Sequence, residues 1–159
     1  MKTTNLKTAA ITALFGIGLL AGCTNSTTNQ KTSDMKTLNL TQEWDKTFPQ
    51  SDKVNHSKVT FTNRYGITLA ADMYVPKNAT GKLPAIAVCG PFGAVKEQAA
   101  GLYAQTMAER GFLTVAFDPS YTGESGGEPR YVVSPDINTE DFSAAVDFLA
   151  TNDLSLIHI

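Results

Sequence analysis

Two glycine-rich segments could take part in chemistry, and the first of them is Gly90-Pro91-Phe92-Gly93. It follows an apolar run and precedes a predicted helix, so its free N–H groups could bind an anion. That geometry serves either an oxyanion hole or a phosphate site. The chain has neither a Gly-Lys-Ser/Thr nor a Gly-x-Gly-x-x-Gly sequence to favour phosphate. Pro91 has no N–H, so Phe92 or Gly93 must be the donor. A plain tight connection between a strand and a helix is an equal alternative.

The second segment contains Gly123-Glu124-Ser125-Gly126-Gly127, which looks like an interrupted Gly-x-Ser-x-Gly sequence. A catalytic serine in that sequence lies on a tight turn between a strand and a helix. Ser125 lies deep inside a long loop instead, with no helix directly behind it. We therefore interpret Ser125 as a turn residue. Ser120 has only Pro119 and the end of a predicted strand nearby, and it is no better a candidate.

Other reactive side chains near these segments have a structural interpretation. Asp118, Glu124 and Glu128 could suggest a divalent-cation site, but the ligand pattern of a calcium loop is missing, and we expect these acids to be solvated. The sequence predicts no metal and no cofactor. His56 precedes the first predicted strand and is expected at the surface. Cys89 ends an apolar run and is expected to be a small core residue.

The hydropathy pattern places both segments in an α/β sheet. Alternating residues predict a hairpin with strands over 59–62 and 67–75 and a turn at 63–66. Apolar runs over 85–89 and 113–117 predict strands that are covered on both faces. Because ligands bind beyond the carboxyl ends of such strands, both candidate segments fall where a site is expected.

Apolar residues spaced three and four apart predict two helices. The first spans about residues 96–110, and its expected buried stripe comprises Ala99, Leu102, Tyr103, Thr106 and Met107. The second begins near Asn138 or Thr139, with Glu140 and Asp141 in its first turn, where carboxylates favour the helix dipole. Its expected buried face comprises Phe142, Ala145, Val146 and Leu149. A hairpin followed by strand, helix, strand and helix predicts an α/β sheet whose later part is parallel.

The composition is that of a globular, slightly acidic chain. Its 159 residues include 13 Lys+Arg, 15 Asp+Glu and 42% hydrophobic residues. Removal of Lys2 and Lys7, which lie in a predicted leader, leaves 11 basic against 15 acidic residues, a net charge of −4. Since no Lys/Arg run is present either, nucleic acid is not an expected partner. Two cysteines cannot build a disulfide framework.

The N-terminus has the features of a bacterial lipoprotein signal. Lys2 and Lys7 give a positive start, and residues 9–20 form an apolar run. A membrane-spanning helix needs about 20 apolar residues, so this run matches the core of a signal peptide better. Leu20-Ala21-Gly22-Cys23 resembles a lipobox, the site where the cysteine thiol is linked to diacylglycerol and becomes the first residue. The alternative is a buried core helix that ends in a cysteine by chance.

These features predict a signal peptide over 1–22 and a lipid anchor of palmitate-type acyl chains on Cys23. Residues 23–40 are rich in Ser, Thr and Asn and are predicted to form a flexible tether. The expected location is the bacterial cell envelope, with a folded domain held at a membrane and facing outside the cytoplasm.

From about Thr60 to Asp153, the chain resembles the dienelactone-hydrolase and Xaa-Pro dipeptidyl-peptidase-like branch of the bacterial α/β-hydrolases. The matching stretches are Asn63-Arg64-Tyr65-Gly66-Ile67-Thr68-Leu69-Ala70, Leu83-Pro84-Ala85-Ile86, Cys89-Gly90-Pro91-Phe92-Gly93-Ala94-Val95-Lys96-Glu97-Gln98, Ala108-Glu109-Arg110-Gly111-Phe112 and Phe117-Asp118-Pro119-Ser120-Tyr121-Thr122-Gly123-Glu124-Ser125. The last stretch resembles the family's loop after strand 4. This chain has Ser120 or Tyr121 where many members carry arginine.

The resemblance implies the N-terminal half of an α/β-hydrolase sheet in residues 41–153, truncated before strand 5. Family members place the nucleophile, the acid and the histidine after that point. Residues 154–159 do not look like the family's sequence, so His158 is not expected to be a triad member. We expect this chain to be inactive. The alternative is a natural short protein with a C-terminal strand.

The family's activity implies a role for the first loop. A nucleophile–histidine–acid mechanism would act on an ester-like or amide carbonyl of a small molecule or peptide. The resemblance assigns the oxyanion-hole donor to the Phe92 N–H, with Gly90, Pro91, Gly93 and Asp118 lining the site. A rival interpretation is a non-catalytic envelope lipoprotein that binds a small ligand or a protein with the same loops.

Overall fold

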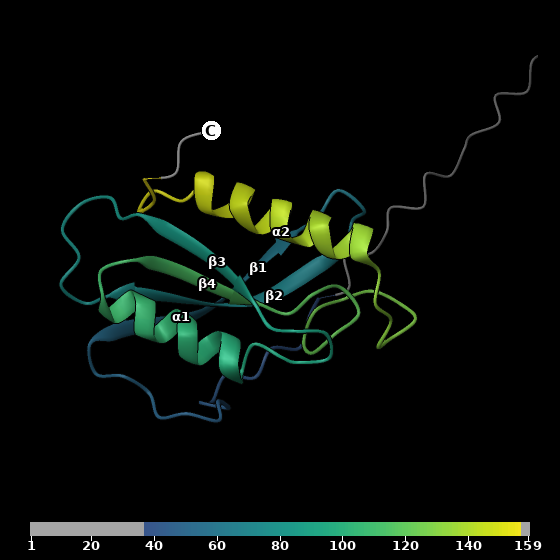
Figure 1. Cartoon of the computed structure of the whole chain (residues 1–159), viewed down its shortest axis with the longest axis horizontal. Helices are drawn as coiled ribbons and strands as arrows, with labels where there is room; N and C mark the ends of the chain where they lie inside the picture. The colour runs from purple at the N-terminus through teal and green to yellow at the C-terminus, as the bar shows by residue number, and fades with distance from the viewer. Residues whose placement is uncertain (1–36, 157–159) are drawn as a thin grey trace, which may run out of the picture. The chain divides into compact units, whose positions relative to one another are not determined.

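The computed structural model describes residues 37–156, and the structural statements below concern that part of the chain. The predicted signal peptide, Cys23, most of the predicted tether and His158 lie outside the described residues. The helices and strands, in chain order, are β1 (Val54–Thr62), β2 (Thr68–Pro76), β3 (Ala85–Cys89), α1 (Ala99–Glu109), β4 (Leu113–Phe117) and α2 (Pro135–Ala150) (Figure 1). Within residues 37–156, no helix is long and apolar enough to cross a bilayer.

The strands form one four-stranded sheet in the order β1-β2-β4-β3. β1 pairs antiparallel with β2, and β2 pairs antiparallel with β4. β3 and β4 are parallel neighbours, with Cys89 opposite Phe117 at their carboxyl ends. This arrangement confirms the predicted α/β sheet with a leading hairpin and a later parallel part. It also brings the two glycine-rich loops to the same edge of the sheet.

The helices cover opposite faces of the sheet (Figure 1). Under α2, the core is made of large side chains from every strand except β3, among them Phe61, Leu69, Leu113 and Phe117. Under α1, the core is built largely from small residues, with Ala100, Ala104 and Ala108 packed against Val54, Tyr74 and Ala116. The sheet is therefore covered on both faces, as the continuous apolar runs predicted.

The predicted buried face of α1 is wrong. The buried residues are Ala100, Gly101, Ala104, Gln105 and Ala108, whereas Leu102 and Tyr103 are 47% and 53% exposed. The small residues let the helix axis lie close to the sheet and to the N-terminal segment. A Cβ on Gly101 would lie 2.3 Å from the Lys96 carbonyl oxygen and 3.0 Å from the Phe48 ring. Close approach outweighs side-chain size here, and the hydropathy pattern alone does not show that.

The predicted start of α2 is also wrong. The helix begins at Pro135 after the N-cap residue Ser134, and Asp136 is the acid of its first turn. Proline is favoured at the first helical position because its missing N–H needs no partner there. The predicted start near residue 138 placed Glu140 and Asp141 in the first turn of the helix. Both residues are instead buried and accept hydrogen bonds from side chains that precede β2.

The predicted buried face of α2 is correct only in part. Ala145 and Leu149 are buried as expected, whereas Phe142 is 43% exposed. The Phe142 ring makes an edge contact with Phe117, at 5.0 Å between centroids, and lines a cavity at the edge of the sheet. Its position beside that cavity explains why it is not fully covered.

β1 is longer than predicted, which changes the environment of His56. The strand pairs with β2 from Val54 opposite Pro76 to Thr62 opposite Thr68. His56 therefore lies inside a strand, with its side chain 14% exposed, and is not the surface residue that was expected. The polar residues of the first half of β1 concealed this part of the strand from the alternation pattern.

β3 is the last of the four strands in the sheet order, and all its residues are half-buried. Just before it, Leu83 donates its N–H to Leu154 O and accepts from the Leu156 N–H, both at 2.7 Å. Leu83 and Ser155 thus form a parallel bridge. Residues 154–156, the first part of the segment 154–159 that does not resemble the family, therefore make backbone contacts with the domain.

Candidate functional site

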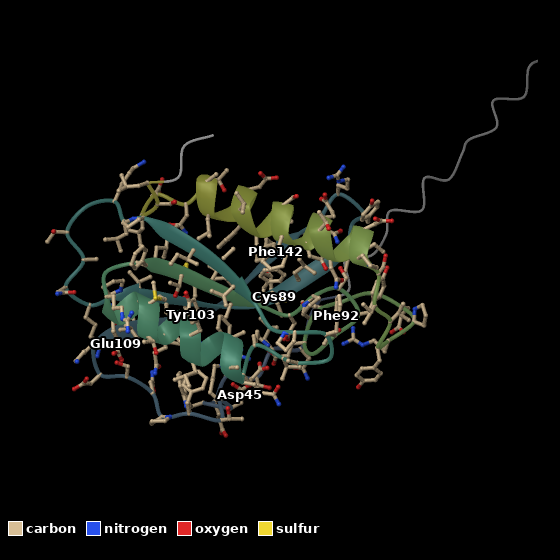
Figure 2. All side chains as sticks on the ribbon, in the orientation of Figure 1. Asp45, Cys89, Phe92, Tyr103, Glu109 and Phe142 are labelled. Atoms are coloured by element: carbon tan, nitrogen blue, oxygen red, sulfur yellow. The ribbon has the colours of Figure 1, made fainter. Side chains whose placement is uncertain are left out.

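A cavity of about 500 Å³ lies where β3 and β4 end. Its lining residues come from the ends of β3 and β4, the loops that follow them and the first half of α2: Cys89, Gly90, Pro91, Phe92, Phe117, Pro119, Pro135, Asn138, Thr139 and Phe142. Figure 2 shows Cys89 at the end of β3, with Phe142 on α2 and Phe92 on the following loop. The cavity is mainly apolar, because three aromatic rings and three prolines contribute to its wall.

The loop after β3 presents an unused backbone donor beside this cavity. Within residues 37–156, no acceptor takes a hydrogen bond from the Phe92 N–H, and the Phe92 side chain is 70% exposed. The Ala94 N–H donates to Pro91 O at 3.0 Å, which closes a turn around Phe92. Gly93 has φ +82°, a conformation that suits glycine. A ligand oxygen in the cavity could therefore accept the Phe92 N–H.

Of the predicted lining residues, the cavity includes Gly90 and Pro91. Gly93 lines a neighbouring cavity of about 240 Å³ together with Tyr131 and Val133. Asp118 is completely buried and does not line the cavity.

Asp118 joins the two loops by accepting hydrogen bonds from both. The Lys96 N–H donates to Oδ1 at 2.8 Å, and the Lys96 ammonium donates to Oδ2 at 2.8 Å. The Glu124 N–H donates to Oδ2 at 3.0 Å. A Cβ on Gly123 would lie 2.2 Å from Oδ2, so only glycine fits beside this carboxylate. The expectation that Asp118 is solvated is wrong, because its carboxylate is the point where the loops meet.

Glu124 is also held by ion pairs and is not solvated. Its Oε2 accepts from the ammonium groups of Lys58 at 2.6 Å and Lys96 at 2.8 Å, and its Oε1 accepts from the Thr41 N–H at 2.6 Å. Burial raises the pKa of Glu124, but these three donors outweigh burial and lower the pKa to about 2. Glu128 is exposed, as expected.

Neither serine of the second loop is placed to act as a nucleophile in this structure. The buried Ser125 hydroxyl accepts from the Ala70 N–H at 2.8 Å and donates to Asp118 O at 2.7 Å. The Ser120 hydroxyl donates to Asp141 Oδ1 at 2.8 Å. Neither residue lines the cavity. The interpretation of Ser125 as a structural residue agrees with this geometry.

His56 forms a histidine–carboxylate pair away from the cavity. Its Nε2 lies 2.8 Å from Asp72 Oδ1, and the Lys46 ammonium lies 3.0 Å from Asp72 Oδ2. Burial raises the pKa of Asp72, but His56 and Lys46 outweigh it, so the pKa is lowered overall. Trp44 packs against the imidazole edge to face, with 5.2 Å between ring centroids. No described serine or cysteine donates to this histidine, so the pair belongs to a structural network.

Three carboxylates of that network come close enough to suggest a cation site. Oxygens of Asp45, Glu97 and Glu124 lie within 4.8 Å of one another. The Lys58 ammonium already lies among them, at 3.2 Å from Asp45, 3.6 Å from Glu97 and 2.6 Å from Glu124. Lys96 also contacts two of the three. Ammonium groups therefore neutralise these acids.

The sequence pattern does not mark Lys46, Lys58 or Lys96 as buried charges, although their side chains are at most 6% exposed. A buried lysine is rare unless it is paired, but nothing in the surrounding sequence marks these positions as buried. The one sequence feature that could have pointed to Lys96 is its place in the stretch 89–98, which resembles the hydrolase family.

Cys89 faces the cavity, and its thiol is not activated. Burial raises the pKa of Cys89, and the nearby charge of Asp118 raises it further, to about 11. At neutral pH the thiol is therefore protonated, and a protonated thiol is a weak nucleophile. Its half-buried position agrees in part with the expectation of a core residue.

Solved structures show that the sheet and its loops have the α/β-hydrolase fold. The α/β hydrolase GrgF from a Penicillium species superposes with a TM-score of 0.57 at 29% identity, over 64% of this chain and 34% of GrgF. The crystal structure of the hypothetical protein PA2218 from Pseudomonas aeruginosa gives a TM-score of 0.73 at 75% identity, over 75% of this chain and 37% of that chain. The predicted hydrolase half-sheet is thereby confirmed.

Residues 65–155 match the X-Pro dipeptidyl-peptidase (S15) family, and the chain belongs to this family. Uncharacterized protein PA2218 of Pseudomonas aeruginosa is 71% identical over 136 residues, which are 82% of this chain and 37% of that protein. Uncharacterized protein YcjY of Escherichia coli is 50% identical over 60% of this chain and 33% of its own length. Thiohydrolase aneE of Aspergillus aculeatus is 34% identical over 62% of this chain and 30% of its own length. The chain thus spans about a third of the length of the curated relatives it matches.

Proposed function

We propose that this chain forms the oxyanion-binding part of a hydrolase that cleaves ester-like or amide carbonyl bonds. The observation that carries the proposal is the unpaired Phe92 N–H beside an apolar cavity at the carboxyl ends of β3 and β4. A backbone N–H in such a position can stabilise the negative charge that forms on the carbonyl oxygen. Membership of the S15 family supports an acyl-bond hydrolase.

In this proposal, the nucleophile, the histidine and the acid come from the rest of a longer protein. The relatives that the chain matches are about twice as long as this chain, and the aligned residues cover 30–37% of each of them. Ser120, Ser125 and Cys89 are also poor nucleophiles. The hydroxyls of Ser120 and Ser125 are used in buried hydrogen bonds, and burial keeps the Cys89 thiol protonated.

For the substrate, we propose an ester or thioester with an apolar acyl group. The name of the thiohydrolase relative supports an ester-like bond over a peptide bond. The cavity wall supports an apolar group, since Phe92, Phe117 and Phe142 contribute rings to it. A small-molecule substrate fits a cavity of about 500 Å³, which is within the usual range of ligand sites.

Phe92 offers a clean test, because its N–H and its side chain can be changed separately. The complete protein encoded by the gene is assayed with p-nitrophenyl and thioester substrates. Phe92→Pro removes the N–H and should lower kcat by about 100- to 1000-fold, the usual effect of losing one oxyanion donor. Phe92→Ala is the matched control: it keeps the N–H, and the lost side chain is 70% exposed. Equal losses in both variants would contradict the proposed role, and an inactive wild-type protein would contradict the hydrolase itself.

We also propose that the protein is a lipid-anchored lipoprotein of a bacterial envelope, attached through Cys23. Support comes from the order of the basic start, the apolar run and Leu20-Ala21-Gly22-Cys23. Mass spectrometry of the protein from a bacterial membrane fraction should find an acylated N-terminal cysteine. Cys23→Ala should accumulate with its first 22 residues uncleaved. A wild-type protein with an unmodified Cys23 would contradict the anchor.

A further inference from the structure

We propose that Lys96 is a positioning residue, whose ammonium group holds the loop of residues 90–95 in the shape that presents the Phe92 N–H to the oxyanion. The inference rests on the proposed function, because it concerns the donor that this function assigns to Phe92. Lys96 itself does not line the cavity, so its effect must pass through the loop.

The two ends of this loop are tied to consecutive residues of one strand end. At the first end, Cys89 pairs with Phe117 in the parallel ladder. At the other end, Lys96 donates two hydrogen bonds to Asp118, from its N–H to Oδ1 and from its ammonium group to Oδ2, both at 2.8 Å. The loop therefore closes on Phe117 and Asp118. The spacing between its ends, and with it the direction of its N–H groups, depends on the Lys96–Asp118 contact.

The ammonium group also keeps a buried carboxylate and a partly buried carboxylate together. Lys96 is completely buried and lies 2.8 Å from oxygens of both Asp118 and Glu124. The Glu124 N–H donates to the same Asp118 oxygen, so the two acidic residues are in contact. Without the positive charge between them, these carboxylates repel each other, and the loops that carry them move apart.

A role for Lys96 in proton transfer does not fit this environment. Burial lowers the pKa of Lys96, but the carboxylates of Asp118, Glu124 and Glu97 outweigh burial and raise the pKa above its ordinary value. The ammonium group therefore stays protonated throughout the pH range of an ordinary hydrolase. A permanent charge that contacts two loops suits a structural clamp.

The test compares Lys96→Met with Lys96→Arg in the complete protein, with Lys82→Met as the control at an exposed lysine. The backbone N–H of residue 96 remains in all variants, so the comparison isolates the ammonium group. We expect Lys96→Met to lower kcat by about 10- to 100-fold with little change in KM, since a donor displaced by about 1 Å can cost that much. Lys96→Arg, which keeps the charge, should recover part of the loss, and Lys82→Met should behave as the wild type. An unchanged kcat in Lys96→Met would overturn the proposal.

If Lys96→Met does not fold, the double variant Lys96→Met/Asp118→Asn decides. It removes both charges of the pair and keeps an oxygen that can accept the residue 96 N–H. The same loss of kcat in this folded variant would support the clamp, and wild-type kcat would refute it.

A second measurement separates this inference from the proposed function. The amide 15N and 1H shifts of Phe92 and Gly93 report on the loop directly, without any turnover. They should move in Lys96→Met and stay in place in Lys82→Met. An inactive wild-type protein would refute the hydrolase, and the shifts would still show whether Lys96 sets the loop. Unmoved shifts together with wild-type kcat would refute the positioning role alone.

Discussion

Replacing Glu124 with glutamine removes one negative charge from between two buried lysines and leaves the shape of the side chain nearly unchanged. In the folded state, the donors around this carboxylate outweigh the effect of burial, and the pKa falls from 4.5 to about 2. Because the folded pKa is the lower one, the charge stabilises the fold above pH 4.5, and this stabilisation is lost as the pH falls towards 2.

The size of the effect follows from that difference in pKa. At about 1.4 kcal/mol per unit, the difference corresponds to about 3 kcal/mol, which is an upper bound. The Glu124 side chain is 16% exposed, and solvent screening reduces the value, so we expect about 1–2 kcal/mol. In the variant, Lys58 retains its ion pair with Asp45 and Lys96 retains its ion pair with Asp118, so neither lysine is left without a carboxylate.

Urea unfolding followed by circular dichroism at several pH values between 7 and 2.5 measures this effect. Glu124→Gln should be less stable than the wild type at pH 7 by the expected 1–2 kcal/mol. The difference should shrink as the pH falls below 4.5 and the wild-type carboxylate takes up its proton. Glu128→Gln, at an exposed acid, is the matched control and should stay within about 0.5 kcal/mol of the wild type. A difference in stability that does not change with pH would refute the electrostatic reasoning.

Three further predictions concern packing, reactivity and the edge of the sheet. Gly101→Ala should destabilise the fold by about 1–3 kcal/mol, because the added Cβ would overlap the Lys96 carbonyl. Tyr103→Ala, on the exposed face of the same helix, should cost under about 1 kcal/mol. Equal unfolding midpoints for the two variants would contradict this prediction. Cys89 should react slowly with iodoacetamide at pH 7 and faster as the pH nears 11, and rapid labelling at pH 7 would contradict its raised pKa. Residues 37–156 expressed alone should associate through the half-exposed β3, and a stable monomer in size-exclusion chromatography would contradict this.

The sequence predicted the parts of the fold that depend on local patterns. The apolar runs 85–89 and 113–117 became β3 and β4 with the expected bounds, because a strand covered on both faces must be apolar throughout. The two strands are parallel neighbours, so the loops that follow them meet at one edge as expected. Chain order and hydropathy were sufficient for this much.

The rest depends on contacts between residues far apart in the chain. The first half of β1 was missed because Lys58 and His56 look like surface residues, although their partners Glu124 and Asp72 bury them. The buried face of α1 was wrong because Gly101 meets Phe48, which lies over fifty residues earlier in the chain. The hydropathy period reports only how apolar residues are spaced along the chain, and it contains no information about such distant partners.

The network of buried charges connects the beginning of the domain with the candidate site. Thr41 and Lys58 bind the Glu124 carboxylate, which in turn contacts Lys96. Lys96 and Asp118 then close the loop that carries Phe92. Because Lys58, Lys96 and Asp118 are charged and buried, the loss of one of them leaves a partner uncompensated and costs more than the loss of a surface ion pair would. A change at Lys58 should therefore reach the loop of residues 90–95, although Lys58 does not line the cavity.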